Sequence, residues 1–299
     1  MADLLSPRVS FTTITPFRGI ISCLVLSVAY VASLYVLKSP YPRDHPKTIK
    51  QRFRSVFVVS LMSPLYVWLW ADGTSDETAL SLWKYLGIHF QSIFIAILFP
   101  LLLTMILFFG PTMLLYFSRE FVSVKGFLEY PSSWVNSINL RNYLVAPLSE
   151  EFVFRACLLP MLVPGFGNVM PIFICPLFFG VAHIHHVIER LQHGENPKDV
   201  WFSAIFQFGY TTVFGCYSAF LFLRTGHLIG PVVCHSFCNF MGFPQVEQVP
   251  SSKFPRLITA SFLIGLILFL VLALPLTNPS WYHSVYYQEQ LQYRMTHKS

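Results

Sequence analysis

Glu150 and Glu151 interrupt a long apolar stretch, and adjacent carboxylates in such surroundings are suited to acid–base chemistry. The stretch 143–163 reads YLVAPLSEEFVFRACLLPMLV and contains one further charged residue, Arg155. A charge near the centre of a bilayer costs at least about 2.5–3.5 kcal/mol on insertion scales, so intramembrane charges usually mark a functional cavity. The pattern therefore predicts a buried acid–base site within a membrane-length segment.

The spacing of the three charges divides them into two groups. Glu151 and Arg155 are four residues apart, so they share one face of a helix and can form an ion pair. Glu150 projects about 100° away from Glu151 and has no cation on its own helix. We expect Glu151 and Arg155 to give orientation and structural support, and Glu150 to perform the chemistry.

Two later apolar segments carry polar residues at the same helical spacing. Phe179 and His183 are four apart, as are His235 and Asn239. By itself, His183 fits a capping or hydrogen-bonded histidine at a helix end. His235 and Asn239 alone fit interhelical hydrogen bonds, each typically worth well under 2 kcal/mol. Three such segments together predict side chains that converge on one cavity.

These residue types fit a hydrolase that activates water. A carboxylate with a histidine can act as general base, and a second histidine with an asparagine amide can stabilise an oxyanion. His185 and His186 stand close to His183, and spacing alone does not choose among the three.

Other chemistries fit the sequence less well. Glu150, His183 and His235 with one water would make a catalytic zinc site, but no HExxH motif is present. A cysteine nucleophile is another alternative, because Cys234 and Cys238 adjoin His235 and Asn239 in sequence. Neighbouring residues on a helix point in different directions, however, so adjacency in sequence does not make a catalytic pair. The sequence also lacks the G-x-S-x-G motif that would indicate a serine nucleophile. A metal site therefore stays open as a minor alternative, and we expect no cofactor.

Composition places these segments in a membrane. Of 299 residues, 54% are hydrophobic and only 11% are charged, whereas soluble domains carry about 25% charged residues. The net charge of +6 is not concentrated in a basic run on a soluble fold, so nucleic acid is not an expected partner. The composition predicts an all-α, polytopic integral membrane bundle in contact with lipids.

About 20 apolar residues span a bilayer as a helix. We predict about eight transmembrane helices, near 19–37, 55–71, 93–117, 142–163, 169–185, 200–223, 228–243 and 256–274. We predict a single membrane domain over 1–299, with short tails at 1–18 and 275–299. The catalytic core would lie within about 140–243.

Loop charges suggest an orientation for the bundle. Residues 38–54 are strongly basic and residues 72–77 are acidic, which places the first loop in the cytosol and the second outside it. By the same count, the loops near 118–141, 186–199 and 244–255 would also be cytosolic. Residues 79–90 fit either a short interfacial helix or an extension of the third span.

The three motifs, in this order and within apolar segments, resemble those of the CAAX protease and bacteriocin-processing family. More narrowly, the chain resembles the eukaryotic Ras-converting CAAX prenyl endopeptidases of that family. The motifs extend over about 140–243 and read Glu150-Glu151-x-x-x-Arg155, Phe179-x-x-x-His183 and His235-x-x-x-Asn239.

The resemblance implies an activity and its partners. Such enzymes reside in the endoplasmic reticulum membrane and act on prenylated Cys-a-a-X proteins, farnesylated or geranylgeranylated, such as Ras-family GTPases. They remove the last three residues with a water that a glutamate activates, without an essential metal.

Carried over by position, the resemblance implies a role for each motif residue. Glu150 would be the general base, and His183 would hold and polarise the water. His235 and Asn239 would stabilise the oxyanion. The supporting positions would be Glu151, Arg155 and Phe179.

Two other classes of function remain open. A proton-coupled transporter would use the same intramembrane Glu and His residues as a relay, but transporters often show repeat symmetry, which is not visible here. A non-catalytic membrane scaffold would keep the helices without needing all four catalytic positions. All four are present, which favours the enzyme.

Overall fold

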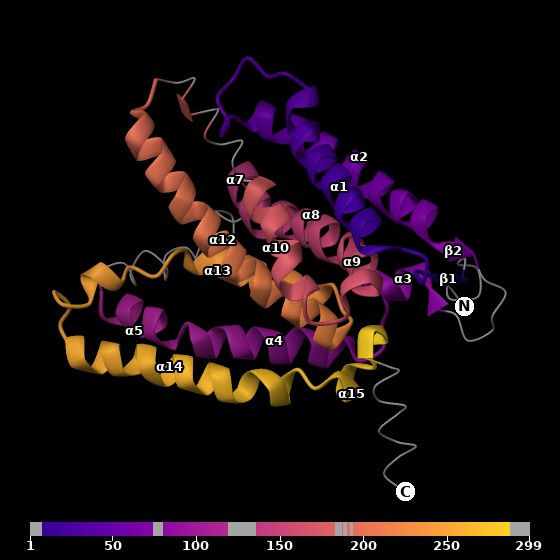
Figure 1. Cartoon of the computed structure of the whole chain (residues 1–299). Coiled ribbons are helices and arrows are strands. Elements are labelled where there is room, and N and C mark those ends of the chain that lie inside the picture. Colours follow the sequence, from indigo (N-terminus) through magenta and orange to yellow (C-terminus); the bar gives the residue numbers. More distant parts are fainter. Residues whose placement is uncertain are drawn as a thin grey trace, which may run out of the picture.

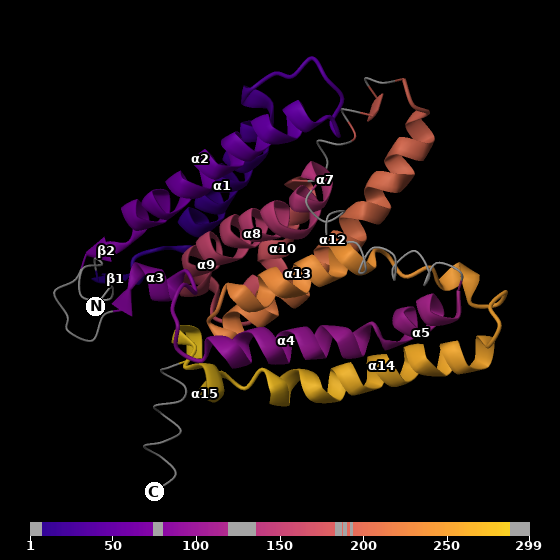
Figure 2. The same cartoon turned by 180° about the vertical axis from the view of Figure 1, so that it is seen from behind.

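A computed structural model describes residues 8–73, 80–118, 136–182, 187, 190–191 and 194–287. Most of these residues form helices, as the composition predicts. Figure 1 shows two flanks with a central group of helices between them, and Figure 2 shows the same arrangement from behind.

Helices α1 (Pro16–Val36) and α2 (Pro46–Trp70) form the first flank and pack against each other. Both begin with proline in the first turn, where a missing N–H costs nothing. The side chains of Thr15 and His45 cap them by accepting backbone N–H groups.

The second flank consists of α4 (Ile93–Leu107), α5 (Phe109–Phe117) and α14 (Pro255–Leu276). Helices α4 and α5 meet at a bend of 61°. Pro111 explains the break, because it has no N–H to donate to the carbonyl of Leu107 one turn earlier.

A helical run of five consecutive pieces crosses the centre of the molecule. The pieces are α7 (Ser137–Leu140), the π-helix η3 (Arg141–Val145), α8 (Ala146–Glu151), the π-helix η4 (Phe152–Cys157) and α9 (Leu159–Phe166). π-Helical turns are rare and occur frequently at functional sites. Here they flank the two adjacent glutamates on both sides.

Three further helices complete the centre: α10 (Pro171–Ala182), α12 (Pro197–Thr225) and α13 (Ile229–Met241). Helix α10 packs along α12, and α13 packs against both α12 and α4. The turn between α12 and α13 contains Gly226 at φ +64°, a left-handed conformation that glycine adopts without a steric penalty.

Each of the eight predicted segments contains helix, but their number as membrane spans is not confirmed. Within the described residues, four helices are long and apolar enough to cross a membrane, or five if the bent pair α4–α5 is one span. Helices α10 and α13 are apolar but shorter. Large apolar side chains are exposed along α1, α2 and α14, which fits contact with lipid in a polytopic membrane protein.

Short elements lie where the chain enters and leaves the bundle. Strands β1 (Arg8–Ser10), β2 (Asp72–Gly73) and β3 (Leu80–Ser81) form an antiparallel sheet in the order β2-β1-β3, a small departure from the all-α expectation. Val9 pairs with Gly73 on one side and with Leu80 on the other.

Helix α3 (Leu82–Tyr85) decides between the two interpretations of residues 79–90. It is a separate short helix rather than an extension of the third span, because residues 86–92 leave helical geometry and Ser92 has φ 59°. The short helix η5 (Val246–Gln248) lies between α13 and α14, and α15 (Pro279–Tyr282) and η6 (Val285–Tyr287) follow α14.

Candidate active site

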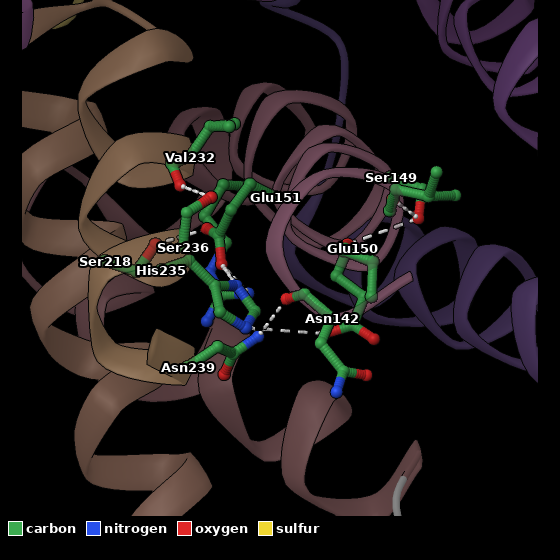
Figure 3. A network of polar contacts seen from close by, with 12 residues as sticks. Asn142, Ser149, Glu150, Glu151, Ser218, Val232, His235, Ser236 and Asn239 are labelled. Atoms are coloured by element: carbon green, nitrogen blue, oxygen red, sulfur yellow. Dashed lines mark hydrogen bonds and ion pairs between the residues drawn. The ribbon is translucent and has the colours of Figure 1, made fainter. Parts of the chain in front are cut away.

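Helices α8, α12 and α13 bring a cluster of polar side chains together at the centre of the molecule (Figure 3). Glu150 and Glu151 come from the end of α8. His235 and Asn239 come from successive turns of α13. Two of the three sequence motifs therefore meet, although they lie more than 80 residues apart.

Glu151 is fully buried and has three partners. Its Oε1 atom accepts a hydrogen bond from Nδ1 of His235 at 2.8 Å and lies 3.2 Å from Nη1 of Arg155. The hydroxyl of Ser218 donates to Oε2. The ion pair with Arg155 is the one that the spacing predicts. A buried carboxylate needs such partners, because isolated burial of a charge is strongly unfavourable.

Arg155 is also fully buried, and aromatic rings surround it. Its guanidinium carbon lies 4.4 Å from the ring centre of Phe179 and 5.9 Å from that of Phe214, distances at which cation–π attraction operates. Gly215 provides the space, since a Cβ there would lie 3.0 Å from Nη2 of Arg155. Phe179, the first residue of the second motif, therefore supports the first motif.

His235 lies between the two glutamates. While Nδ1 is bonded to Glu151, the opposite ring nitrogen Nε2 lies 3.8 Å from Oε2 of Glu150. A hydrogen bond at one ring nitrogen fixes the orientation and tautomer of an imidazole. Glu151 therefore aims Nε2 of His235 toward Glu150.

Asn239 is anchored to the π-helix that precedes the glutamates. Its Nδ2 donates to the carbonyl of Asn142 at 2.8 Å. In this π-helix the carbonyl of Arg141 accepts from Ala146, so the donor for Asn142 would be the next residue, Pro147. Proline has no N–H, and the carbonyl of Asn142 is thus left for a side chain.

A cavity of about 950 Å³ opens beside this cluster. Glu150, His235 and Asn239 all line it, and the side chain of Glu150 is 21% exposed whereas that of Glu151 is 0% exposed. Apolar side chains of α4, α5 and α14 form one wall: Leu107, Pro111, Phe262, Leu266 and Phe269. Polar groups from the α1–α2 loop, α2 and η3 line another part, called the polar wall below: Arg43, Arg52, Arg141 and Asn142. Apolar side chains of α1 and α2 such as Val31 and Val56 line the cavity as well.

The structure thus brings together three of the four predicted catalytic residues. The fourth, His183, lies outside the described residues, as do His185 and His186. In the part of the chain that is described, no three His, Cys, Asp or Glu side chains are placed to hold a metal ion. The zinc alternative included His183, so an experiment with a chelator is needed to address it.

Three polar contributions were missed by the sequence analysis. Ser218 hydrogen-bonds Glu151, and Asn142 accepts from Asn239. Tyr30 and Ser149 share a hydrogen bond of 2.9 Å beside the cavity. Each of these contacts joins residues at least 67 positions apart, so local spacing does not indicate it. The signal available in the sequence was that Ser149 and Ser218 lie in apolar segments.

Comparison with known proteins gives consistent similarities. Residues 132–241 match the sequence model of a family described as type II CAAX prenyl endopeptidase, Rce1-like. The chain is 51% identical over 274 residues to CAAX prenyl protease 2 of Homo sapiens, which covers 89% of this chain and 83% of the relative. It is 32% identical over 288 residues to CAAX prenyl protease 2 of Arabidopsis thaliana, covering 89% of this chain and 91% of the relative.

The similarity extends to fungi. CAAX prenyl protease 2 of Saccharomyces cerevisiae is 29% identical over 265 residues, which is 78% of this chain and 82% of the relative. No solved structure is significantly similar to the chain. The matched residues of the family model contain all three motifs.

Proposed function

The chain belongs to the CAAX prenyl protease 2 family, and from this premise we propose that it is a membrane-embedded endopeptidase acting on prenylated Cys-a-a-X proteins. It would cut after the prenylated cysteine and release the a-a-X tripeptide. One observation supports this function beyond the family: Glu150, His235 and Asn239 line the same cavity.

The walls of that cavity suit a substrate with a lipid and a peptide. A prenyl chain is apolar and would enter from the bilayer against the wall that α4, α5 and α14 form. The peptide would lie against the polar wall near Glu150 and Asn142. Both parts of the substrate would then reach the same side chains without leaving their preferred surroundings.

Glu150 acts as the general base. A water placed beside it gives a proton to the carboxylate while its oxygen attacks the carbonyl carbon of the prenylated cysteine. The tetrahedral intermediate then expels the amine of the following residue, and the protonated Glu150 returns the proton to that nitrogen. His183 takes part by holding the water, a role that the family resemblance alone supplies.

His235 and Asn239 stabilise the oxyanion. Because Nδ1 of His235 donates to Glu151, His235 fills this role as the imidazolium, in which Nε2 also carries a proton that it can donate. Nε2 lies near Glu150, and the amide of Asn239 follows one turn later on α13. An asparagine amide has two N–H donors, so Asn239 retains one after it bonds the carbonyl of Asn142. Removing one donor of an oxyanion hole typically costs about 10²–10³ in kcat.

The protein resides in the endoplasmic reticulum membrane with its cavity open to the cytosol, and its substrates include Ras-family GTPases. The basic loop between α1 and α2 supports this orientation, because positive loops favour the cytosolic side. Arg43 of that loop lines the cavity. The location and the choice of GTPases follow from the family resemblance.

A peptide assay tests the activity directly. Membranes containing the protein are incubated with a farnesylated Cys-a-a-X peptide, and release of the tripeptide is measured by mass spectrometry with and without a chelator. We expect release that the chelator does not reduce. Absence of release from a folded protein would contradict the proposed function, and chelator-sensitive release would indicate a metal enzyme.

A further inference from the structure

Three arginines line the cavity. Arg43 comes from the loop between α1 and α2, Arg52 from α2, and Arg141 from the start of η3. None of the three belongs to a sequence motif that the catalytic proposal uses. Arginine is especially suited to binding carboxylates, because its planar fork can donate two parallel hydrogen bonds.

A carboxylate of the protein itself already occupies this cluster. Oδ1 of Asp44 lies 2.7 Å from Nη1 of Arg141, and the Asp44 side chain is 65% exposed. The hydrogen bond from Arg141 holds the pKa of Asp44 below its ordinary value, and the charges of Arg43 and Arg52 act in the same direction. Arg141 therefore pairs with one exposed carboxylate, on which the charges of Arg43 and Arg52 also act, and a carboxylate of a ligand could take its place.

The separation of Arg141 from Glu150, the proposed base, is comparable to the length of the tripeptide that the reaction releases. Arg141 precedes Glu150 by nine residues on one helical run, which corresponds to at most about 13 Å along the axis, because the π-helical part rises less per residue than an α-helix. An extended tripeptide spans about 10–11 Å from the scissile bond to its terminal carboxylate. A peptide whose cut bond lies at Glu150 would thus place its C-terminus within reach of the arginine side chain.

The hydrogen bonds connect the two ends of this path. Nε of Arg141 donates to the side chain of Asn142 at 3.0 Å, and the carbonyl of Asn142 accepts from Asn239. The start of η3 thus holds an arginine on one side and an oxyanion-stabilising amide on the other. A substrate carboxylate bound to Arg141 would hold the peptide chain beside the amide of Asn239.

We propose that Arg43, Arg52 and Arg141 bind the terminal carboxylate of the substrate and so set the cut three residues from its C-terminus. The proposal rests on the endopeptidase function proposed above. It adds a recognition site for the free C-terminus, with the carboxylate of Asp44 as the group that the substrate displaces.

Two farnesylated peptides of one sequence test this inference, one with a free terminal carboxylate and one with a carboxamide. We expect a KM for the carboxamide at least about tenfold above that for the carboxylate, because a charge-assisted pair is lost. We expect Arg141→Gln to reduce this preference by about tenfold, with kcat for the carboxylate peptide changing much less than KM.

Two further variants separate binding from a structural effect. Asp44→Asn removes the competing carboxylate and should lower KM for the carboxylate peptide, the opposite direction to Arg141→Gln. Arg18→Gln is the matched control, because Arg18 is exposed in the first turn of α1 and does not line the cavity. It should leave the preference for the carboxylate unchanged.

The outcomes distinguish this inference from the function beneath it. Equal KM values for both peptides with the wild-type protein would overturn the carboxylate site while leaving the endopeptidase intact. An equal loss for both peptides in Arg141→Gln would also overturn it and would indicate contact with anionic lipid headgroups instead. Cleavage of neither peptide by the wild-type protein would contradict the proposed function itself.

Discussion

Glu150 and Glu151 are chemically identical neighbours with opposite surroundings. Glu151 is closed off from solvent and bound to Arg155, His235 and Ser218. Glu150 faces the cavity, with Nε2 of His235 at 3.8 Å. The comparison indicates that the buried cluster around Glu151 holds the site rigid, whereas the cavity wall around Glu150 performs the reaction.

The largest expected effects come from replacing each glutamate in turn. Glu150→Gln should reduce tripeptide release by about 10²–10⁴-fold and leave thermal unfolding in detergent unchanged, because only the base is lost. Glu151→Gln should lose activity and also about 3–5 kcal/mol of stability, because Arg155 then keeps a buried charge without its partner.

Activity assays and unfolding curves on the two purified variants check this pair of outcomes. Wild-type activity in Glu150→Gln would refute the assignment of the base. An unchanged melting temperature in Glu151→Gln would show that the buried ion pair does not support the fold.

Packing around Arg155 predicts the next largest effect. Gly215→Ala would place a Cβ 2.8 Å from Cβ of Pro176 and 3.0 Å from Nη2 of Arg155, and such overpacking typically costs about 1–3 kcal/mol. Gly209→Ala on the same helix is the matched control, since a Cβ there meets nothing within 4 Å. Thermal unfolding should separate the two, and equal melting temperatures would contradict close packing at Gly215.

Ser218→Ala tests a single hydrogen bond of the buried cluster. The variant removes a donor to the Glu151 carboxylate and should cost about 1–3 kcal/mol of stability, with a several-fold loss of activity. Ser261→Ala serves as the control, because the hydroxyl of Ser261 bonds the carbonyl of Leu257 on its own helix. A stability loss no greater than that of the control would contradict the role of Ser218.

The smallest expected effect concerns the cavity wall. Pro147→Ala supplies an N–H that can donate to the carbonyl of Asn142 and compete with Asn239. We expect kcat to fall a few-fold without a change in KM. In an Asn239→Ala background the same change should have little further effect, because the competing contact is already absent. Fully additive losses would rule out this connection.

Much of the site could be predicted from local spacing. The pairing of Glu151 with Arg155 follows from their separation of four residues, and the same spacing places His235 and Asn239 together on α13. The partner of His235 could not be predicted, because its bond to Glu151 joins residues 84 positions apart. No periodic pattern indicates which side of an imidazole meets which glutamate.

The fold shows the same division between local and tertiary information. Hydropathy located helical segments in all eight predicted places, yet it gave more spans than the four or five that satisfy length and composition within the described residues. Short apolar helices such as α10 and α13 have local compositions similar to those of membrane-spanning helices. Hydropathy therefore counted them as spans. The two π-helices around α8 also had no recognisable pattern in the sequence.

By itself the sequence determined a membrane protein with an intramembrane carboxylate, because apolar length and four-residue spacing are properties of a single helix. Only the tertiary structure decided that Glu151 is enclosed and Glu150 is open to a cavity, because burial depends on neighbouring helices. It likewise brought Arg43, Arg52 and Arg141 to the same cavity, since they come from three separate elements.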